Sequence, residues 1–388
     1  MKINISNPRR LAGIIILAAY FMIISGLLIR SFHKPEYNWD MLAYIAVVLS
    51  RTHKDIGEIH RDTYAAVRDQ IPSASFQQLV NPANNYRINV YRNDTAFYQQ
   101  LPFYVVKPLY TTLVYLGYRS GFSLPASTVL PSVLACLFIA GLLLIWFSRY
   151  LSLFYAAAAA LLLMLSAPLL TVSGLSTPDA LSAFLLLCVF YFIIEKPMLV
   201  PVIFFMTAAI LTRLDNIIAC VLIVFLMAIA KEPPFKIRVS GFLGLFFWLS
   251  AVYFMVSRAA GAFGFGILYY PSFLSYLNMA HQFHSVFSWS AYLQVFRSDA
   301  VSGFYHSAIA LFGFLALLLF YRNRSGPLRS LSFYSLLPVL LCGIIGLRFI
   351  LDPDISDRFY IPYYLFIAVL WVKSFTESGV AAFQRTKI

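Results

Sequence analysis

The sequence predicts an all-α polytopic membrane protein with about ten transmembrane helices, because three features of the chain agree. Hydrophobic residues occupy 61% of the 388 positions and charged residues only 12%, whereas a soluble domain carries about 25% charged residues. The mean hydropathy is +0.77. The apolar runs approach the roughly 20 residues that a helix needs to cross a bilayer, and they lack the alternation of a membrane β-barrel. We therefore expect one transmembrane domain over residues 1–388.

Charged and turn-forming residues divide the apolar sequence into spans. The first, Leu11–Ile29, is preceded by Arg9 and Arg10 and followed by Arg30. An even number of spans would place both termini on the same side of the membrane. Nine further spans are predicted in chain order: Leu130–Phe147, Leu151–Val172, Ala180–Ile194, Met198–Leu211, Ile217–Ala230, Phe242–Val256, Phe304–Phe320, Phe333–Ile350 and Phe359–Val372.

Two polar stretches interrupt this pattern. Residues 31–124 are predicted to form an extracytoplasmic loop subdomain, and residues 257–302 form a second extracytoplasmic stretch rich in aromatic residues. Within the first, Phe103–Tyr118 contains Lys107-Pro108 and several tyrosines, which favours a helix at the membrane interface over a lipid-facing span.

The distribution of charge supports this topology. Fourteen of the 29 basic residues but only three of the 16 acidic residues fall on the predicted cytoplasmic side, so about +11 of the net charge of +13 lies there. Short cytoplasmic loops accumulate Lys and Arg. We expect a multi-pass protein of the inner (plasma) membrane with both termini cytoplasmic. Its basic character then reflects contact with anionic membrane lipids and requires no nucleic acid.

Asp40 is the first candidate for chemistry. It lies in Tyr37-Asn38-Trp39-Asp40, shortly after the first span. A carboxylate at the membrane boundary can act as a general base or a metal ligand. The alternative is a structural role, since an aspartate before Met41–Leu49 is well placed to cap a helix.

Asp179 is the second acidic candidate, with a helix cap or first-turn role as its alternative. His53 and His60, and also His281 and His284, have spacings that align on a helix. Neither pair comes with a third ligand at a fixed spacing, so no metal ligand is assigned.

Several short motifs together resemble a known class of enzymes. They are Asp40 in the early loop, the Pro- and Tyr-rich segment Leu101–Tyr110, Thr177-Pro178-Asp179, Thr212-Arg213-Leu214-Asp215, and Asp357-Arg358-Phe359-Tyr360-Ile361-Pro362. In this order along the chain, they resemble the GT-C class of polytopic membrane glycosyltransferases, such as protein mannosyltransferases and aminoarabinose transferases, which use polyprenyl phosphate sugars.

The resemblance implies a catalytic carboxylate at Asp40, with or without a divalent metal ion, and cations that hold the donor phosphate. Because a leaving phosphate develops negative charge, Arg358, Lys107 and Arg213 are the expected phosphate ligands. Each arginine has an alternative. Arg213 can simply pair with Asp215, and Arg358 can pair with the aspartates that precede it. Arg348 can extend to the membrane interface.

We therefore expect an inverting glycosyltransferase that moves a sugar from a polyprenyl phosphate carrier to a glycan, lipid or protein acceptor on the extracytoplasmic face. The stretch Phe263–Trp289 would border the lipid or sugar groove or anchor the protein at the interface. The alternative is a transporter or flippase of a lipid-linked or polar solute, in which Arg213, Asp215 and Arg348 line a path through the bundle. A non-catalytic scaffold would depend on none of these residues.

Overall fold

The structure, a computed structural model, describes residues 8–230, 234–235, 239–261, 289–306, 308–323 and 332–385. No β-strand occurs in these ranges, and only isolated bridges, such as the parallel one between Glu36 and Leu175, interrupt the helical pattern. The prediction of an all-α fold is confirmed for the part of the chain that is described. The predicted groove Phe263–Trp289 lies outside it, apart from Trp289.

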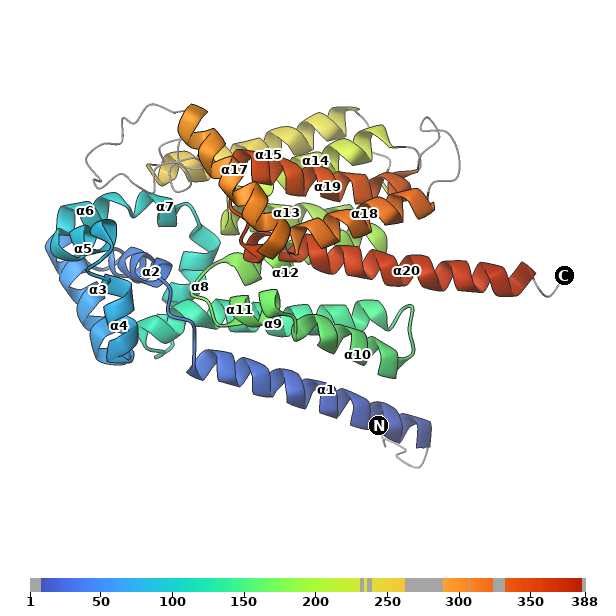
Figure 1. Ribbon diagram of the computed structural model, residues 1–388, viewed down its shortest axis with the longest axis horizontal. Helices are drawn as coiled ribbons and strands as arrows, with labels where there is room; N and C mark the ends of the chain where they lie inside the picture. Colours follow the sequence, from blue (N-terminus) through green and yellow to red (C-terminus); the bar gives the residue numbers. More distant parts are fainter. Residues whose placement is uncertain are drawn as a thin grey trace.

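Helix α1 (Pro8–His33) leads into a series of short helices that occupies the predicted loop subdomain (Figure 1). These are α2 (Asp40–Leu49), α3 (Ile56–Gln70), α4 (Ser73–Val80), α5 (Asn85–Arg92), α6 (Asp94–Gln99), α7 (Pro102–Val105) and α8 (Pro108–Arg119). They pack around a hydrophobic core of their own, to which α2 contributes every residue from Met41 to Leu49. The subdomain is attached to the rest of the protein through contacts of α2, α3 and α8 with α9 (Leu124–Phe147) and of α8 with α13 (Leu199–Thr212).

The remaining helices form a bundle. They are α10 (Leu153–Met164), α11 (Ala167–Ser173), α12 (Asp179–Ile194), α13 (Leu199–Thr212), α14 (Asn216–Ile229), α15 (Val239–Ala259), α17 (Trp289–His306), α18 (Ile309–Asn323), α19 (Phe333–Leu351) and α20 (Ile361–Arg385), with the 3₁₀ turn η2 (Asp357–Phe359) before the last. The predicted span Phe304–Phe320 needs correction, because it begins inside α17, and α18 begins only at Ile309.

Four described helices are long and apolar enough to cross a membrane: Arg10–His33, Leu124–Phe147, Val239–Ala259 and Phe333–Leu351. Helices α10 and α11 make a fifth if the pair, bent by 69°, is one span. Pro168 lies in the first turn of α11, where the missing N–H and fixed φ of proline favour a new helix start over continuation of α10. The protein thus has four or five apolar helices of membrane-crossing length, and the count of ten spans stays a prediction.

Helix α12 is the central element of the bundle. It packs against α9, α13 and α20, and almost all of its residues are buried. A helix that is apolar on all sides is stable only when other helices surround it. The packing of α9, α13 and α20 against α12 therefore fixes the positions of residues at both ends of α12.

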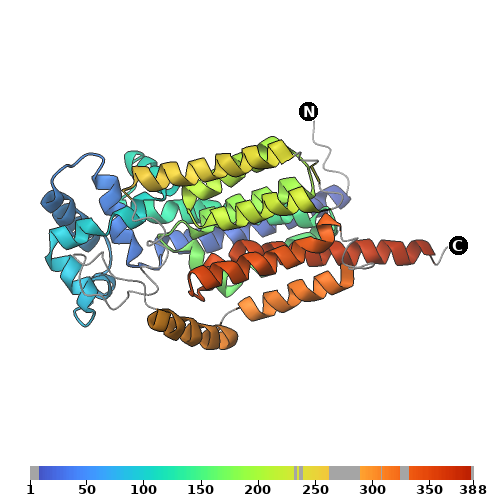
Figure 2. The same cartoon turned by 90° about the horizontal axis from the view of Figure 1, so that it is seen from above.

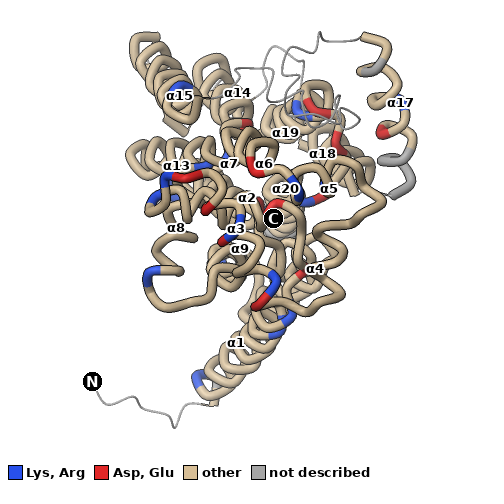
Figure 3. Tube along the Cα trace, turned by 90° about the vertical axis from the view of Figure 1, so that its left-hand side faces the viewer, with Lys and Arg blue, Asp and Glu red and all other residues tan. Residues whose placement is uncertain are grey.

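The first turn of α1 and the end of α20 lie at the opposite end of the molecule from α2–α8 (Figures 1 and 2). Figure 3 views the molecule from the end that carries α2–α8 and shows acidic and basic residues interleaved across it. The apolar bundle therefore has one polar end formed by the subdomain and by the nearby ends of the long helices.

The segment after α1 is joined to the turn before α12. Glu36 N–H donates to the carbonyl of Gly174 at 3.1 Å, and the hydroxyls of Ser31 and Ser173 are 2.7 Å apart. These contacts bring the residues just before Asp40 beside those just before Asp179.

Candidate active site

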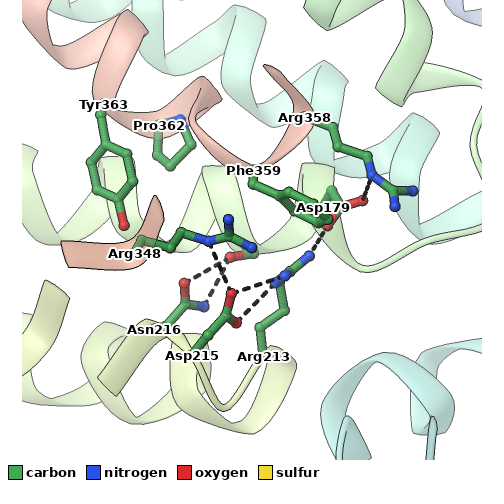
Figure 4. A pocket seen from close by; sticks show the side chains of 10 residues that line it. Asp179, Arg213, Asp215, Asn216, Arg348, Arg358, Phe359, Pro362 and Tyr363 are labelled. Atoms are coloured by element: carbon green, nitrogen blue, oxygen red, sulfur yellow. Dashed lines mark hydrogen bonds and ion pairs between the residues drawn. The ribbon is translucent and has the colours of Figure 1, made fainter. Parts of the chain in front are cut away.

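Four of the five predicted site residues meet in one chain of ion pairs. Asp40 Oδ2 lies 3.9 Å from Arg358 Nη1, and Arg358 Nε lies 3.8 Å from Asp179 Oδ2. Arg213 Nη1 donates to the other oxygen of Asp179 (Figure 4). Because these residues come from α2, α12, the end of α13 and η2, four distant parts of the sequence converge at this place.

Asp215 and Arg348 extend the chain of ion pairs. Arg213 binds Asp215 through two hydrogen bonds of 3.0 and 2.9 Å, and Asp215 also accepts from Arg348 Nε at 3.2 Å. The expected Arg213–Asp215 pair exists, but it is not exclusive. The interpretation of Arg348 as an interface-seeking residue is wrong, because this side chain is 6% exposed and is held inside the protein. We call these residues the Asp179 cluster: Asp40, Asp179, Arg213, Asp215, Arg348 and Arg358.

Asp40 does not cap α2. Trp39 occupies the cap position and makes no side-chain cap bond. The Asp40 carboxylate instead accepts a hydrogen bond of 3.0 Å from Tyr104 Oη and a longer one of 3.4 Å from Asn38 Nδ2. The side chain keeps 31% of its surface exposed. Asp40 is therefore a positioned carboxylate that a ligand can reach.

Asp179 has a different environment. It lies in the first turn of α12, as its structural alternative expects, but its side chain makes no cap bond. Only 1% of the side chain is exposed, and its two oxygens face Arg213 and Arg358. The two predicted carboxylates thus differ in accessibility, since Asp40 is open and Asp179 is enclosed by guanidinium groups.

Arg358 is the least satisfied cation of the cluster. Its ion pairs reach Asp40 and Asp179 rather than the aspartates that precede it in the sequence, so the interpretation as a local pair is wrong. Both contacts are longer than a hydrogen bond, and the buried Nε has no hydrogen-bond partner. A buried donor without a partner is costly. The guanidinium is therefore arranged to accept a further anion.

Lys107 lies beside the cluster, immediately before α8. Its ammonium donates to Tyr44 Oη at 2.8 Å and lies 5.2 and 5.1 Å from the ring centroids of Tyr44 and Tyr104. Burial lowers the pKa of Lys107 to about 8, and the negative charge of Asp40 only partly offsets this effect. The ammonium is thus held by aromatic groups rather than by a carboxylate, and it remains able to bind an anion.

A small pocket opens beside Asp179, Arg213 and Arg358 (Figure 4). Phe359 lines it, and the guanidinium carbons of Arg213, Arg348 and Arg358 lie 4.5, 4.1 and 4.6 Å from the centroid of its ring. An aromatic ring can hold three cations near one another because its faces are electron-rich. The pocket is lined by Asp179, Ser182, Arg213, Asp215, Asn216, Arg348, Arg358, Phe359, Pro362 and Tyr363.

The donor set around Asp40 does not fit a divalent metal ion. Among the described residues, no group of three or more His, Cys, Asp or Glu side chains is placed to hold one. The charged neighbour of Asp40 is a guanidinium, which competes with a metal ion for the same carboxylate. No step of the proposed reaction is assigned to a metal.

Tyr44, Tyr104 and Phe359 contribute to the site, although the sequence assigned no role to them. Tyr104 lies in the Pro- and Tyr-rich segment and Phe359 follows Arg358, so both were inside recognised motifs. Tyr44 gave no signal, because it resembles any other aromatic residue in an apolar helix.

Comparison with protein-family models, with curated proteins and with solved structures gives no match for this chain. The candidate site therefore rests on its own geometry: an exposed carboxylate, an incompletely paired guanidinium and a cation held by tyrosines meet where the subdomain joins the bundle.

Proposed function

We propose that the protein is an inverting glycosyltransferase that moves a sugar from a polyprenyl phosphate carrier to an acceptor on the extracytoplasmic face of the membrane. One observation carries the proposal. Arg358 lies within 4 Å of Asp40 and Asp179 but is hydrogen-bonded to neither, and its buried Nε has no partner. A carboxylate and an available cation in contact are what a transfer from a phosphate leaving group requires.

The phosphate leaving group explains why Arg358 and Lys107 lie at the site. When the bond between the anomeric carbon and the phosphate oxygen breaks, its electron pair remains on the phosphate, whose charge becomes more negative. Arg358 would bind this oxygen directly, and Lys107 would approach from the tyrosine side. Charge-assisted hydrogen bonds to such an oxygen strengthen as the charge develops.

The acceptor hydroxyl explains the role of Asp40 as a base. In the proposed reaction an acceptor hydroxyl attacks the anomeric carbon from the face opposite the phosphate, and Asp40 takes the hydroxyl proton. Tyr104 fixes one oxygen of this carboxylate through its 3.0 Å hydrogen bond. The second oxygen is the one that faces Arg358, so binding of phosphate to Arg358 would weaken that pair and leave Asp40 a better base.

Asp179 and Arg213 fit positioning roles better than direct ones. Arg213 already donates to both Asp179 and Asp215, and the enclosed Asp179 has little access to an acceptor. We propose that Asp179 orients Arg358 and Arg213. Arg213 then supports the phosphate site mainly through its charge.

The placement of the cluster supports an extracytoplasmic site. Asp40, Asp179, Asp215 and Arg348 all lie at helix ends or in the turns between helices, and α2, which carries Asp40, lies at the end of the molecule opposite the termini (Figure 1). With both termini cytoplasmic, as the charge distribution predicts, this end would face outward. A lipid phosphate at the membrane surface would then reach the cations while its polyprenyl chain stays in the bilayer.

The test is transfer of labelled sugar from a panel of polyprenyl phosphate donors in reconstituted vesicles. We expect Asp40→Asn to lower transfer by at least 100-fold, since loss of a general base costs about 10²–10⁴-fold. Asp69→Asn is the matched control, because that carboxylate is 68% exposed and pairs only with its neighbour Arg68 in the described structure. Equal transfer by both variants would contradict the proposal.

The transporter alternative predicts another result from the same vesicles. Solute or lipid flux would appear without consumption of donor, and changes at Arg213 or Asp215 would reduce it more than Asp40→Asn. The geometry favours the enzyme, because the pocket beside Asp179 and Arg358 lies at helix ends.

A further inference from the structure

A second group of residues lies around Trp39, the neighbour of Asp40 in the chain. Trp39 precedes Asp40 in the chain, and its ring lies 6.1 Å from that of Tyr86 in an edge-on arrangement. The guanidinium carbon of Arg87 lies 5.5 Å from the Trp39 ring centroid. Helix α5 thus places an aromatic ring and a cation against the residue that adjoins the proposed base.

Amide groups with unused hydrogen-bonding capacity complete this group. Gln100 is 3% exposed, accepts from Tyr86 Oη at 2.9 Å, and leaves its buried Nε2 without a partner. Asn38 donates weakly to Asp40, and its buried Oδ1 has no partner either. Buried amide atoms are nearly always hydrogen-bonded. One buried donor, on Gln100, and one buried acceptor, on Asn38, are therefore left without a hydrogen-bond partner near Trp39.

We infer that Asn38, Trp39, Tyr86, Arg87 and Gln100 form the acceptor subsite, and that the acceptor presents a carbohydrate ring there. The inference rests on the proposed function and specifies its acceptor. A half-buried indole offers a flat apolar surface with a polar edge, which matches the apolar face of a sugar ring. Amide donors and acceptors match its hydroxyl groups.

The chemistry of this subsite argues against the other acceptor classes. A lipid acceptor would need a continuous apolar groove, whereas Trp39 has the guanidinium of Arg87 beside its ring and the amide of Asn38 next to it in the chain. An extended peptide would need unpaired backbone groups or a sheet edge, and α2 and α5 are helices whose backbone bonds are internal. Sites built on hydrogen bonds reject ligands that lack the matching groups.

The test measures binding of saccharides without any donor. Saturation-transfer NMR would be recorded on the full-length protein in nanodiscs with methyl glycosides, disaccharides and Ser/Thr-rich peptides as probes. We expect at least one saccharide to bind, and Trp39→Ala to weaken its apparent affinity at least tenfold. Trp248→Ala serves as control, because this indole is 52% exposed on α15, which packs against α13 and α14.

Trp39→Phe keeps an aromatic ring and should retain most of the binding, which separates loss of the platform from misfolding. Binding of peptides but not saccharides, no saccharide binding at all, or equal binding by Trp39→Ala and the unchanged protein would each overturn the inference. The assay contains no donor, so failure of the transfer reaction leaves its outcome intact. Likewise, the transfer rate of Trp39→Ala can be measured against the concentration of acceptor saccharide. The same dependence as in the unchanged protein would refute the subsite and leave the proposed function standing.

Discussion

The two ends of α12 carry two ion-pair clusters that are built differently. At its C-terminal end, Glu195 is bound by Arg149 Nε at 2.9 Å, by Trp146 Nε1 at 3.0 Å and by Tyr150 Oη, with Lys373 at 3.8 Å. Its side chain is 6% exposed. At the N-terminal end, the Asp179 cluster leaves Arg358 Nε without a partner and borders a pocket.

The difference shows how similar residues serve different purposes. The Glu195 carboxylate has its hydrogen-bonding capacity filled by neighbours from α9, from the turn after α9 and from α20, as expected of a buried charge whose role is to fix helix positions. Within the Asp179 cluster, Arg213 and Asp215 are hydrogen-bonded to each other, but Arg358 Nε has no partner. Lys107, beside the cluster, is held by a tyrosine hydroxyl. Incomplete pairing, rather than charge alone, distinguishes a candidate binding site from a structural contact.

The largest expected effect tests that distinction directly. We expect Arg358→Gln to reduce kcat/KM for sugar transfer about 10²–10³-fold, the usual cost of removing one donor that stabilises developing negative charge. Transfer should fall far more than thermal stability, because Arg358 is hydrogen-bonded to neither Asp40 nor Asp179. Arg61→Gln, at an exposed pair in α3, is the control. A strongly lowered unfolding temperature without a specific loss of transfer would contradict this prediction. Arg358 would then have a structural role, as Arg149 has beside Glu195.

An intermediate effect should appear in the pH dependence. The pKa of Lys107 is lowered by burial to about 8, so its charged fraction falls as the pH rises through that value. If the ammonium binds phosphate, kcat/KM should decline up to about tenfold per pH unit above pH 8. Bound phosphate stabilises the charged form of Lys107, so kcat should decline at a higher pH than kcat/KM does.

Lys107→Arg provides the comparison for this profile, because a guanidinium stays charged throughout this range. We expect that variant to lose the decline above pH 8, whatever its absolute rate. The same decline in both proteins would show that another group titrates and that Lys107 does not act through its charge.

The smallest effect on transfer should come from the opposite end of α12. Glu195→Ala leaves the Trp146 and Tyr150 donors without their acceptor, at a cost on the order of 1–3 kcal/mol in stability. Transfer by the folded protein should stay within about twofold of the original rate. Glu377→Ala is the control, since that carboxylate is 63% exposed. Loss of transfer at unchanged stability would mean that the two ends of α12 are coupled.

The sequence by itself determined the helical class, the polar subdomain between the first two long apolar helices, and the residue types of the site. Long apolar runs predict helices, because the backbone groups of a segment inside a membrane must form their hydrogen bonds within the protein. Asp40, Asp179, Arg213 and Arg358 were identifiable because charged residues beside apolar helices are few.

Only the tertiary structure decided how these residues pair. The sequence allowed Arg358 to pair with the preceding aspartates and Arg348 to extend to the interface, and packing excluded both. The bridge between Glu36 and Leu175, and the burial of α12, bring Asp40 within reach of a guanidinium more than 300 positions later in the chain. Pairing depends on distances between helix ends, and these are set by long-range packing that no local pattern records.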